Sequence, residues 1–180
     1  MKLVFFILIF FLNYNNLNAN EKLNIINKLS KINSIEFNFR QINNKSEETG
    51  KCLLLFPARL NCDYNDEKRK QLIINKKSLA ITQRKYNKTY YYPISKSHFV
   101  DILNKEKLVN LINQSVINIV DEQINLINTN GIIILFNKSN YNLMGWEIKD
   151  KFNNKVSFLI DIISTNIDID KKLFQIPKLN

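Results

Sequence analysis

Residues 50–94 read GKCLLLFPARLNCDYNDEKRKQLIINKKSLAITQRKYNKTYYYPI. This stretch contains four or five short apolar segments separated by tight polar turns: KCLLLF, LNCDY, QLIIN, SLAITQ and TYYYPI. Segments of this length and composition are typical of β-strands. Because strands so close in sequence can pair only through hairpins, they must run antiparallel. The stretch therefore predicts a β-meander, around which the rest of the chain is interpreted.

The first hairpin of the meander turns at Pro57, which cannot donate a hydrogen bond to a ladder. We expect the pairing to place Phe56 near Leu60 and Cys52 near Tyr64. Side chains alternate along a strand, so one face is predicted to carry an apolar set: Cys52, Leu54, Phe56, Leu60, Cys62 and Tyr64. In this register the two cysteines are diagonal and too far apart for a bridge, whereas a shift of one pair would align them.

The segments before the meander change their periodicity. Apolar residues at helical spacing predict an amphipathic helix over residues 21–32. The pattern then alternates with a period of two in IEFNFRQ, which predicts a strand with Ile35, Phe37 and Phe39 on one face. Residues 43–49 are polar and predict a turn that leads into the meander.

Helical spacing returns after the meander. Ser97 is suited to cap a helix with an apolar stripe of Phe99, Ile102 and Leu103, and a second short helix is expected after the charged residues 105–107. Strand patterns then resume in SVINIV, QINLIN, IIILF, LMGWEIK and KVSFLIDII, before the closing segment IDIDKKLFQIP. A large antiparallel sheet of about ten strands, with a leading helix and a helical insert, predicts an α+β fold.

The first 19 residues have the pattern of a secretory signal peptide. Lys2 is followed by an apolar run from Leu3 to Leu12, and the small residue Ala19 stands at the expected cleavage position. The run is shorter than the about 20 apolar residues that span a bilayer. No cysteine lies near the cleavage position, so we expect no lipid anchor there. Residues 20–180 are expected to form a single domain that is soluble outside the cytoplasm.

Catalytic and cofactor chemistry has little support in the sequence. The chain has three glycines, too few for a glycine-rich phosphate loop, and His98 is its only histidine. There is no CxxC motif, so no metal site is predicted. No Ser-His-Asp order or nucleophile elbow is present either. We therefore expect a protein that is not an enzyme and that needs no cofactor.

The formal net charge of +10 is concentrated partly in the meander, at residues 68–70, 76–77 and 84–88. A signal peptide removes the chain from most nucleic acid, so no nucleic-acid partner is expected. Two interpretations of the basic clusters stay open. They form a solvated rim, or they form a docking surface for an acidic partner or for anionic lipid headgroups.

The order of the elements resembles the outer-membrane lipoprotein carrier family, LolA. Four stretches carry the resemblance: FNFRQ, GKCLLLFPARLNCDY, KQLIINKKSLAITQRKYNKTYYYPI and LMGWEIKDKFNNKVSFLIDIISTNIDIDKKLFQIP. The resemblance implies an incomplete antiparallel β-barrel of about ten to eleven strands. Its concave apolar face would be covered by a helical lid, here an insert over about residues 97–113.

The resemblance also implies a function. Proteins of this family bind the acyl chains of lipoproteins that an inner-membrane ABC transporter of the LolCDE type releases, and they deliver them across the periplasm to the outer-membrane receptor LolB. We therefore expect a monomeric periplasmic carrier with acylated lipoproteins, such a transporter and, where one exists, a LolB-like receptor as partners. The acyl-chain cavity is expected to be formed by twelve side chains: Phe37, Phe39, Leu54, Phe56, Leu60, Tyr90, Tyr92, Phe99, Ile102, Leu103, Trp146 and Phe158.

Three alternatives remain at this point. The same apolar residues would also suit a dry core, because apolar alternation marks burial and not occupancy. A sensor module of the envelope with a similar half-barrel, and without a transport role, is a second candidate.

The third alternative concerns what holds the lid. The family commonly has a basic residue before the hairpin proline, where this chain has Phe56. Either another polar group holds the lid, or apolar contact does.

Overall fold

A computed structural model describes residues 19–43, 46–94, 99–149 and 153–178 of the chain. The predicted signal peptide and the predicted cap at Ser97 lie outside these residues. No helix in the described part of the chain has the length and the apolar character needed to cross a membrane.

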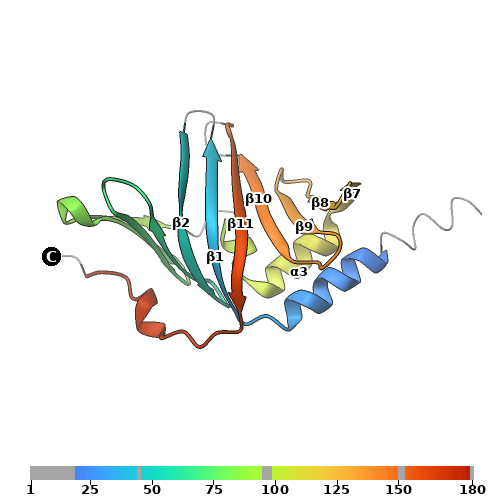
Figure 1. The fold of residues 1–180 in the computed structure, drawn as a ribbon, viewed down its shortest axis with the longest axis horizontal. Coiled ribbons are helices and arrows are strands. Elements are labelled where there is room, and N and C mark those ends of the chain that lie inside the picture. Colours follow the sequence, from blue (N-terminus) through green and yellow to red (C-terminus); the bar gives the residue numbers. More distant parts are fainter. Residues whose placement is uncertain (1–18, 44–45, 95–98, 150–152, 179–180) are drawn as a thin grey trace, which may run out of the picture.

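The described residues form one antiparallel sheet of eleven strands (Figure 1). The strands are β1 (Ser34–Asn43), β2 (Ser46–Leu55), β3 (Arg59–Tyr64), β4 (Lys70–Asn75), β5 (Ser78–Gln83), β6 (Lys88–Pro93), β7 (Val116–Val120), β8 (Gln123–Ile127), β9 (Ile133–Asn137), β10 (Leu143–Lys149) and β11 (Lys155–Thr165). A helix over residues 19–30 precedes them, and two helices, α2 (Phe99–Ile102) and α3 (Lys105–Gln114), lie between β6 and β7. Two 3₁₀ helices complete the fold, η1 (Arg84–Tyr86) and η2 (Lys171–Phe174).

The spatial order of the sheet is β6-β5-β4-β3-β2-β1-β11-β10-β9-β8-β7. The first and the last strand in sequence therefore lie side by side at its centre, and two meanders extend from them to the free edges, β6 and β7. Figure 1 shows the sheet curving around α2 and α3. This is the predicted α+β fold with an incomplete antiparallel barrel, which is thereby confirmed.

The register of the first hairpin differs from the prediction by one pair. Leu54 pairs with Leu60 and Cys52 pairs with Cys62, because the turn is centred on Pro57 and not on the residue after it. The predicted inward set is almost unchanged, since a shift of two residues preserves the side to which each side chain points. The expectation of diagonal cysteines was wrong: Cys52 and Cys62 form a disulfide, with their Cα atoms 4.1 Å apart.

Two element boundaries also differ from the prediction. Most of the expected polar turn over residues 43–49 is strand, because β2 already begins at Ser46, where Asn43 Oδ1 accepts a hydrogen bond from the Ser46 N–H at 2.9 Å. The charged residues 105–107 do not precede the second insert helix but form the first turn of α3. Its N-cap is Asn104, whose side chain accepts a hydrogen bond from the Lys107 N–H.

The outer face of the first meander is covered by the C-terminal segment. Asn61 Nδ2 donates to the carbonyl of Leu173 at 2.8 Å, and the Tyr91 hydroxyl donates to the carbonyl of Pro177 at 3.1 Å. These contacts hold η2 against β3 and β4, where Phe174 is fully buried. The meander is therefore packed on both sides, and its inner side is the one that faces the helices.

Candidate functional site

Two rows of paired residues cross the concave side of the first six strands. The first row is Ile35, Leu54, Leu60, Ile74, Leu79 and Tyr92. The second row is Phe37, Cys52, Cys62, Leu72, Ile81 and Tyr90. Because directly paired residues point to the same side of a sheet, the rows form a continuous apolar surface that becomes aromatic at the β6 edge.

Aromatic rings join the two halves of the barrel. Phe158 stacks on Trp146 from β10, with ring centroids 4.7 Å apart, and on Phe39 from β1, at 4.9 Å. Phe39 also meets the ring of Tyr64 from β3 edge to face, at 4.8 Å. The strand between them carries Gly50, where a Cβ would lie 2.6 Å from the Phe39 ring. The missing side chain at this position lets two strands that are not neighbours bring their rings together.

Helices α2 and α3 fill one end of the concave side. Ile102, Leu103, Leu108 and Ile112 are buried in the same apolar core as the sheet rows. Ile102 and Leu103 point into this core, as predicted for the insert; the side chain of Phe99 lies outside the described part of the structure. We refer to the insert formed by α2 and α3 as the lid.

The lid is held by a few polar contacts at its two ends. Lys105 Nζ, at the start of α3, donates to the carbonyl of Ser30 at 3.3 Å and to Asn33 Oδ1 at 3.2 Å. The same ammonium lies over the ring of Phe56, and partial burial lowers the pKa of Lys105. At the other end of α3, Lys22 Nζ donates to the carbonyls of Asn113 and Ser115, at 2.9 Å and 2.6 Å.

These contacts favour the first of the two alternatives for the lid. A polar group does hold it, but the cation comes from the lid and from the leading helix, and not from the hairpin. The hairpin instead offers the face of the Phe56 ring and the N–H of Ala58, which donates to the carbonyl of Leu103 at 2.7 Å. Partners that lie about 72 residues apart in sequence could not be recognised from a local pattern.

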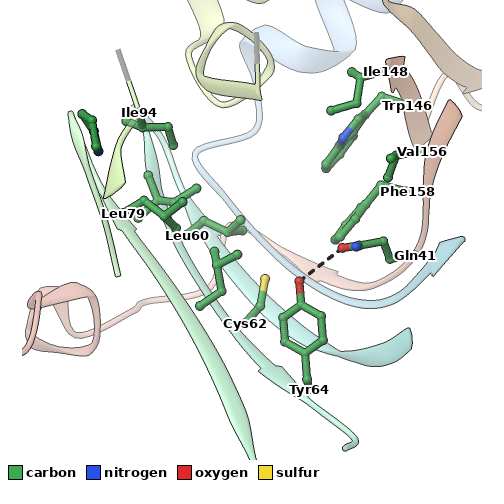
Figure 2. Close-up of a pocket in the computed structure, with 13 residues that line it drawn as sticks. Gln41, Leu60, Cys62, Tyr64, Leu79, Ile94, Trp146, Ile148, Val156 and Phe158 are labelled. Carbon is green, nitrogen blue, oxygen red and sulfur yellow. Dashed lines mark hydrogen bonds between the residues drawn. The ribbon is translucent and has the colours of Figure 1, made fainter. Parts of the chain in front are cut away.

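A cavity of about 280 Å³ lies on the concave side of the sheet, between its two halves (Figure 2). It is lined by side chains from both halves of the barrel: Gln41, Leu60, Cys62, Tyr64, Leu72, Ile74, Leu79, Pro93, Ile94, Trp146, Ile148, Val156 and Phe158. Its wall is apolar apart from a pair at one end, where the Tyr64 hydroxyl donates to Gln41 Oε1 at 3.2 Å. Burial, with a further contribution from the carboxylates of Glu48 and Asp66, raises the pKa of Tyr64, so its hydroxyl remains protonated.

The structure places eleven of the twelve predicted cavity residues in four environments; the twelfth is Phe99, whose side chain is not described. Leu60, Trp146 and Phe158 line the cavity. Five others are buried in the surrounding core without lining it: Phe37, Phe39, Leu54, Ile102 and Leu103. Phe56 is half-buried beneath Lys105. Tyr90 and Tyr92 stand in the concave rows but at the free edge, where they are 43% and 47% exposed.

The remaining lining residues were not among those predicted, although a signal for several of them exists in the sequence. Gln41 continues the alternation of Phe37 and Phe39 by one step. Ile148 and Val156 follow Trp146 and precede Phe158 by the same period of two. Pro93 and Ile94 gave no such signal, because they end β6 where the chain leaves the sheet.

The basic clusters of the meander divide into two kinds. Lys70 and Arg84 form ion pairs with Glu48 and Asp63. Five other cations surround a shallow outer groove at the β4–β5 turn and η2: Arg59, Lys76, Lys77, Lys171 and Lys172. Within the described residues, no group of three or more His, Cys, Asp or Glu side chains is arranged to hold a metal ion.

Comparison with known proteins gives one family. The family model described as outer membrane lipoprotein carrier protein LolA matches residues 30–177 of the chain. A search of curated proteins gives no match. Among solved structures, the chain is similar to the lipoprotein LppX of Mycobacterium tuberculosis, with 8% identity, a TM-score of 0.50, and coverage of 86% of this chain and 98% of that one. At this identity the likeness to LppX shows a shared fold.

Two further structures are similar to a lesser degree. One is a LolA superfamily protein from Nitrosomonas europaea, with 9% identity, a TM-score of 0.42, and coverage of 81% of this chain and 91% of that one. The other is from the complex of MucA and MucB of Pseudomonas aeruginosa, with 12% identity, a TM-score of 0.48, and coverage of 88% of this chain and 61% of that one.

Proposed function

Since the chain belongs to the LolA family of outer-membrane lipoprotein carriers, we propose that it is a periplasmic carrier that binds the acyl chains of lipoproteins. The observation that supports this most directly is the cavity, an apolar space on the concave side of the sheet that is lined by side chains from both halves of the barrel. An acyl chain gains about 0.8 kcal/mol for each CH₂ group that leaves water, so a long chain favours such a space by on the order of ten kcal/mol.

We infer from the size of the cavity that it enlarges when cargo binds. At about 280 Å³ it lies just below the range of about 300–1,000 Å³ that is usual for pockets of drug-sized ligands. The space suits part of one acyl chain and is too small for several. We therefore propose that α2 and α3 move away from the sheet when cargo enters, and that the aromatic edge at Tyr90 and Tyr92 becomes part of the enlarged site.

The weak fastening of the lid suits such a movement. The contacts at Lys105 and Lys22 are a small number of hydrogen bonds, each worth about 0.5–1.5 kcal/mol. Burial of an acyl chain therefore supplies more free energy than these polar contacts hold, and its contacts with the sheet replace the apolar contacts that Ile102, Leu103 and Leu108 lose when the lid moves. The carrier would then be closed when empty and open when loaded, and delivery would return it to the closed state.

We further propose that the cargo comes from an inner-membrane ABC transporter of the LolCDE type and is delivered to the outer membrane, through a LolB-like receptor where one exists. The role is non-enzymatic and requires no cofactor. The support for these partners is membership of the family.

The test is a release assay with inner-membrane vesicles that contain a newly acylated lipoprotein. The purified exported protein is added, and lipoprotein in the soluble fraction is measured by immunoblot. We expect a stoichiometric soluble complex that later transfers its cargo to outer-membrane vesicles. A complex that forms but never transfers cargo would favour the sensor alternative. The absence of any complex, with an acyl probe also unbound, would overturn the proposal.

A further inference from the structure

Gln41 and Tyr64 carry the only side-chain oxygen atoms among the residues that line the cavity. The two side chains come from β1 and β3, and they meet across Gly50, which has no side chain to separate them. Figure 2 shows the pair at one end of the cavity, away from Ile94. The pair therefore makes one end of the cavity polar, and the other lining side chains are apolar apart from the indole N–H of Trp146.

The hydrogen bond between the pair leaves donors unused. The Tyr64 hydroxyl donates to Gln41 Oε1, and burial keeps that hydroxyl protonated. Within the described residues, the amide N–H₂ group of Gln41 has no hydrogen-bond partner; it is not fully buried, and Gln41 is one of the residues that line the cavity. A polar group that loses water without a partner destabilises the bound state, so a ligand that supplies an acceptor at this point is preferred over one that does not.

A second observation indicates which path the hydrocarbon part of such a ligand follows. Leu60 and Tyr64 are four residues apart on β3, which corresponds to about 13 Å along a strand. The side chains between the two ends are apolar and include Cys62, whose sulfur is in the disulfide. A hydrocarbon chain fits this path, and its polar end would meet Gln41 and Tyr64.

We propose that Gln41 and Tyr64 form a subsite for the carbonyl group of an ester- or amide-linked acyl chain, whose hydrocarbon part extends toward Leu60 and Ile94. The amide of Gln41 donates to the carbonyl oxygen, while Tyr64 fixes the orientation of that amide. An ether-linked or plain alkyl chain has no carbonyl oxygen to accept this hydrogen bond, so it binds more weakly. This inference rests on the proposed function, because it specifies the ligand of the same cavity.

The experiment compares two ligands that differ only in the carbonyl: monopalmitoylglycerol and its ether counterpart, hexadecylglycerol. Each displaces an environment-sensitive apolar dye from the purified protein. We expect the unmodified protein to bind the ester about five- to tenfold more tightly than the ether, as one good hydrogen bond allows. Gln41→Leu and Tyr64→Phe should each reduce this ratio to about one while they still bind both ligands.

A matched variant separates carbonyl recognition from general loss of packing. Leu79→Ala removes part of the apolar wall of the same cavity and should weaken the binding of both ligands equally. The ratio of ester to ether affinity should therefore be preserved. Circular dichroism checks that each variant is folded, and Tyr64→Phe keeps the ring contacts if Gln41→Leu does not fold. Equal binding of ester and ether by the unmodified protein, or a ratio that survives in both variants, overturns the subsite but not the carrier. Binding of neither ligand by the unmodified protein contradicts the carrier function itself.

Discussion

The ammonium of Lys105 lies 5.5 Å from the centre of the Phe56 ring. A cation in the lid thus rests on an aromatic ring in the barrel, at the hairpin position where the family commonly has a basic residue. The same ammonium is hydrogen-bonded to Ser30 and Asn33, so one side chain ties together the leading helix, the hairpin and the lid.

Lys105→Met is expected to loosen the lid without unfolding the barrel. The change removes a cation–π contact and two hydrogen bonds, together worth about 1.5–4 kcal/mol. Hydrogen exchange of the amides in α3 should therefore accelerate by at least about tenfold, while that of β1 and β11 remains unchanged. Lys105→Arg is the control and should behave nearly as the unmodified protein. Equal acceleration in lid and sheet would show that Lys105 supports the whole fold instead.

Leu60→Glu is expected to abolish cargo pick-up more completely than it reduces stability. Leu60 is 1% exposed and lines the cavity, so a carboxylate there stays near cavity water in the empty protein but must be desolvated when an acyl chain binds. That desolvation costs several kcal/mol when no partner is present. Thermal unfolding and lipoprotein release are measured on the same preparations. Val116→Glu, at a position that is 68% exposed on the β7 edge, is the control and should retain pick-up.

The Leu60 prediction distinguishes a ligand cavity from a dry core. If the space were inaccessible to water, the variant should fail to fold at all. Normal pick-up by a folded Leu60→Glu protein would mean that acyl chains bind elsewhere.

Replacing both cysteines by alanine should lower the free energy of unfolding by about 2–3 kcal/mol, because the Cys52–Cys62 bridge closes a loop of ten residues in the unfolded chain. Denaturant unfolding with and without reductant measures the effect. The double variant should be insensitive to reductant, and mass spectrometry after alkylation should find no free thiol in the unmodified protein. Identical unfolding of the two proteins would exclude a stabilising bridge.

The stability of the sheet centre should depend on pH through Glu36. Its hydrogen bond from Lys51, and a second one from Ser164, lower the pKa of Glu36 below its ordinary value of 4.5. A carboxyl group whose pKa is lowered by folding stabilises the fold fully above its ordinary pKa, and this contribution is lost as the pH falls toward the lowered value. Glu36→Gln should therefore flatten the decline of stability between about pH 5 and pH 3. A decline of equal steepness in both proteins would contradict this role.

The sequence predicted the strands and their inner faces because alternation is a local property. Phe37, Leu54 and Leu60 could be assigned to one side from their own neighbourhood alone. The register could not be assigned in this way, because moving Cys52 from opposite Tyr64 to opposite Cys62 leaves every side chain on the same face. The conformation of the turn around Pro57 decides the register, and the alternation of apolar and polar residues does not predict that conformation.

The candidate site was predictable only in its apolar part. Trp146 and Phe158 were expected in the cavity because the strands that carry them belong to the stretches that resemble the family, and they line it. Gln41 was missed because its role depends on Tyr64, which reaches it from two strands away. Lys105 was missed for a similar reason: its partners Ser30 and Asn33 come close only when the leading helix and the lid are both in place.

The central pairing of β1 with β11 has a consequence for folding during synthesis. Ile35 pairs with Thr165, so a ribosome that adds about 5–20 residues per second completes β11 roughly 6–26 s after β1. During this interval β1 can pair with β2, but its other edge has no partner and the two meanders are not joined. The nascent chain therefore cannot reach its final form before synthesis is nearly finished. For the exported carrier that we propose, this delay would keep the polypeptide without its closing strand, and so in a state that can still pass unfolded through a translocation channel.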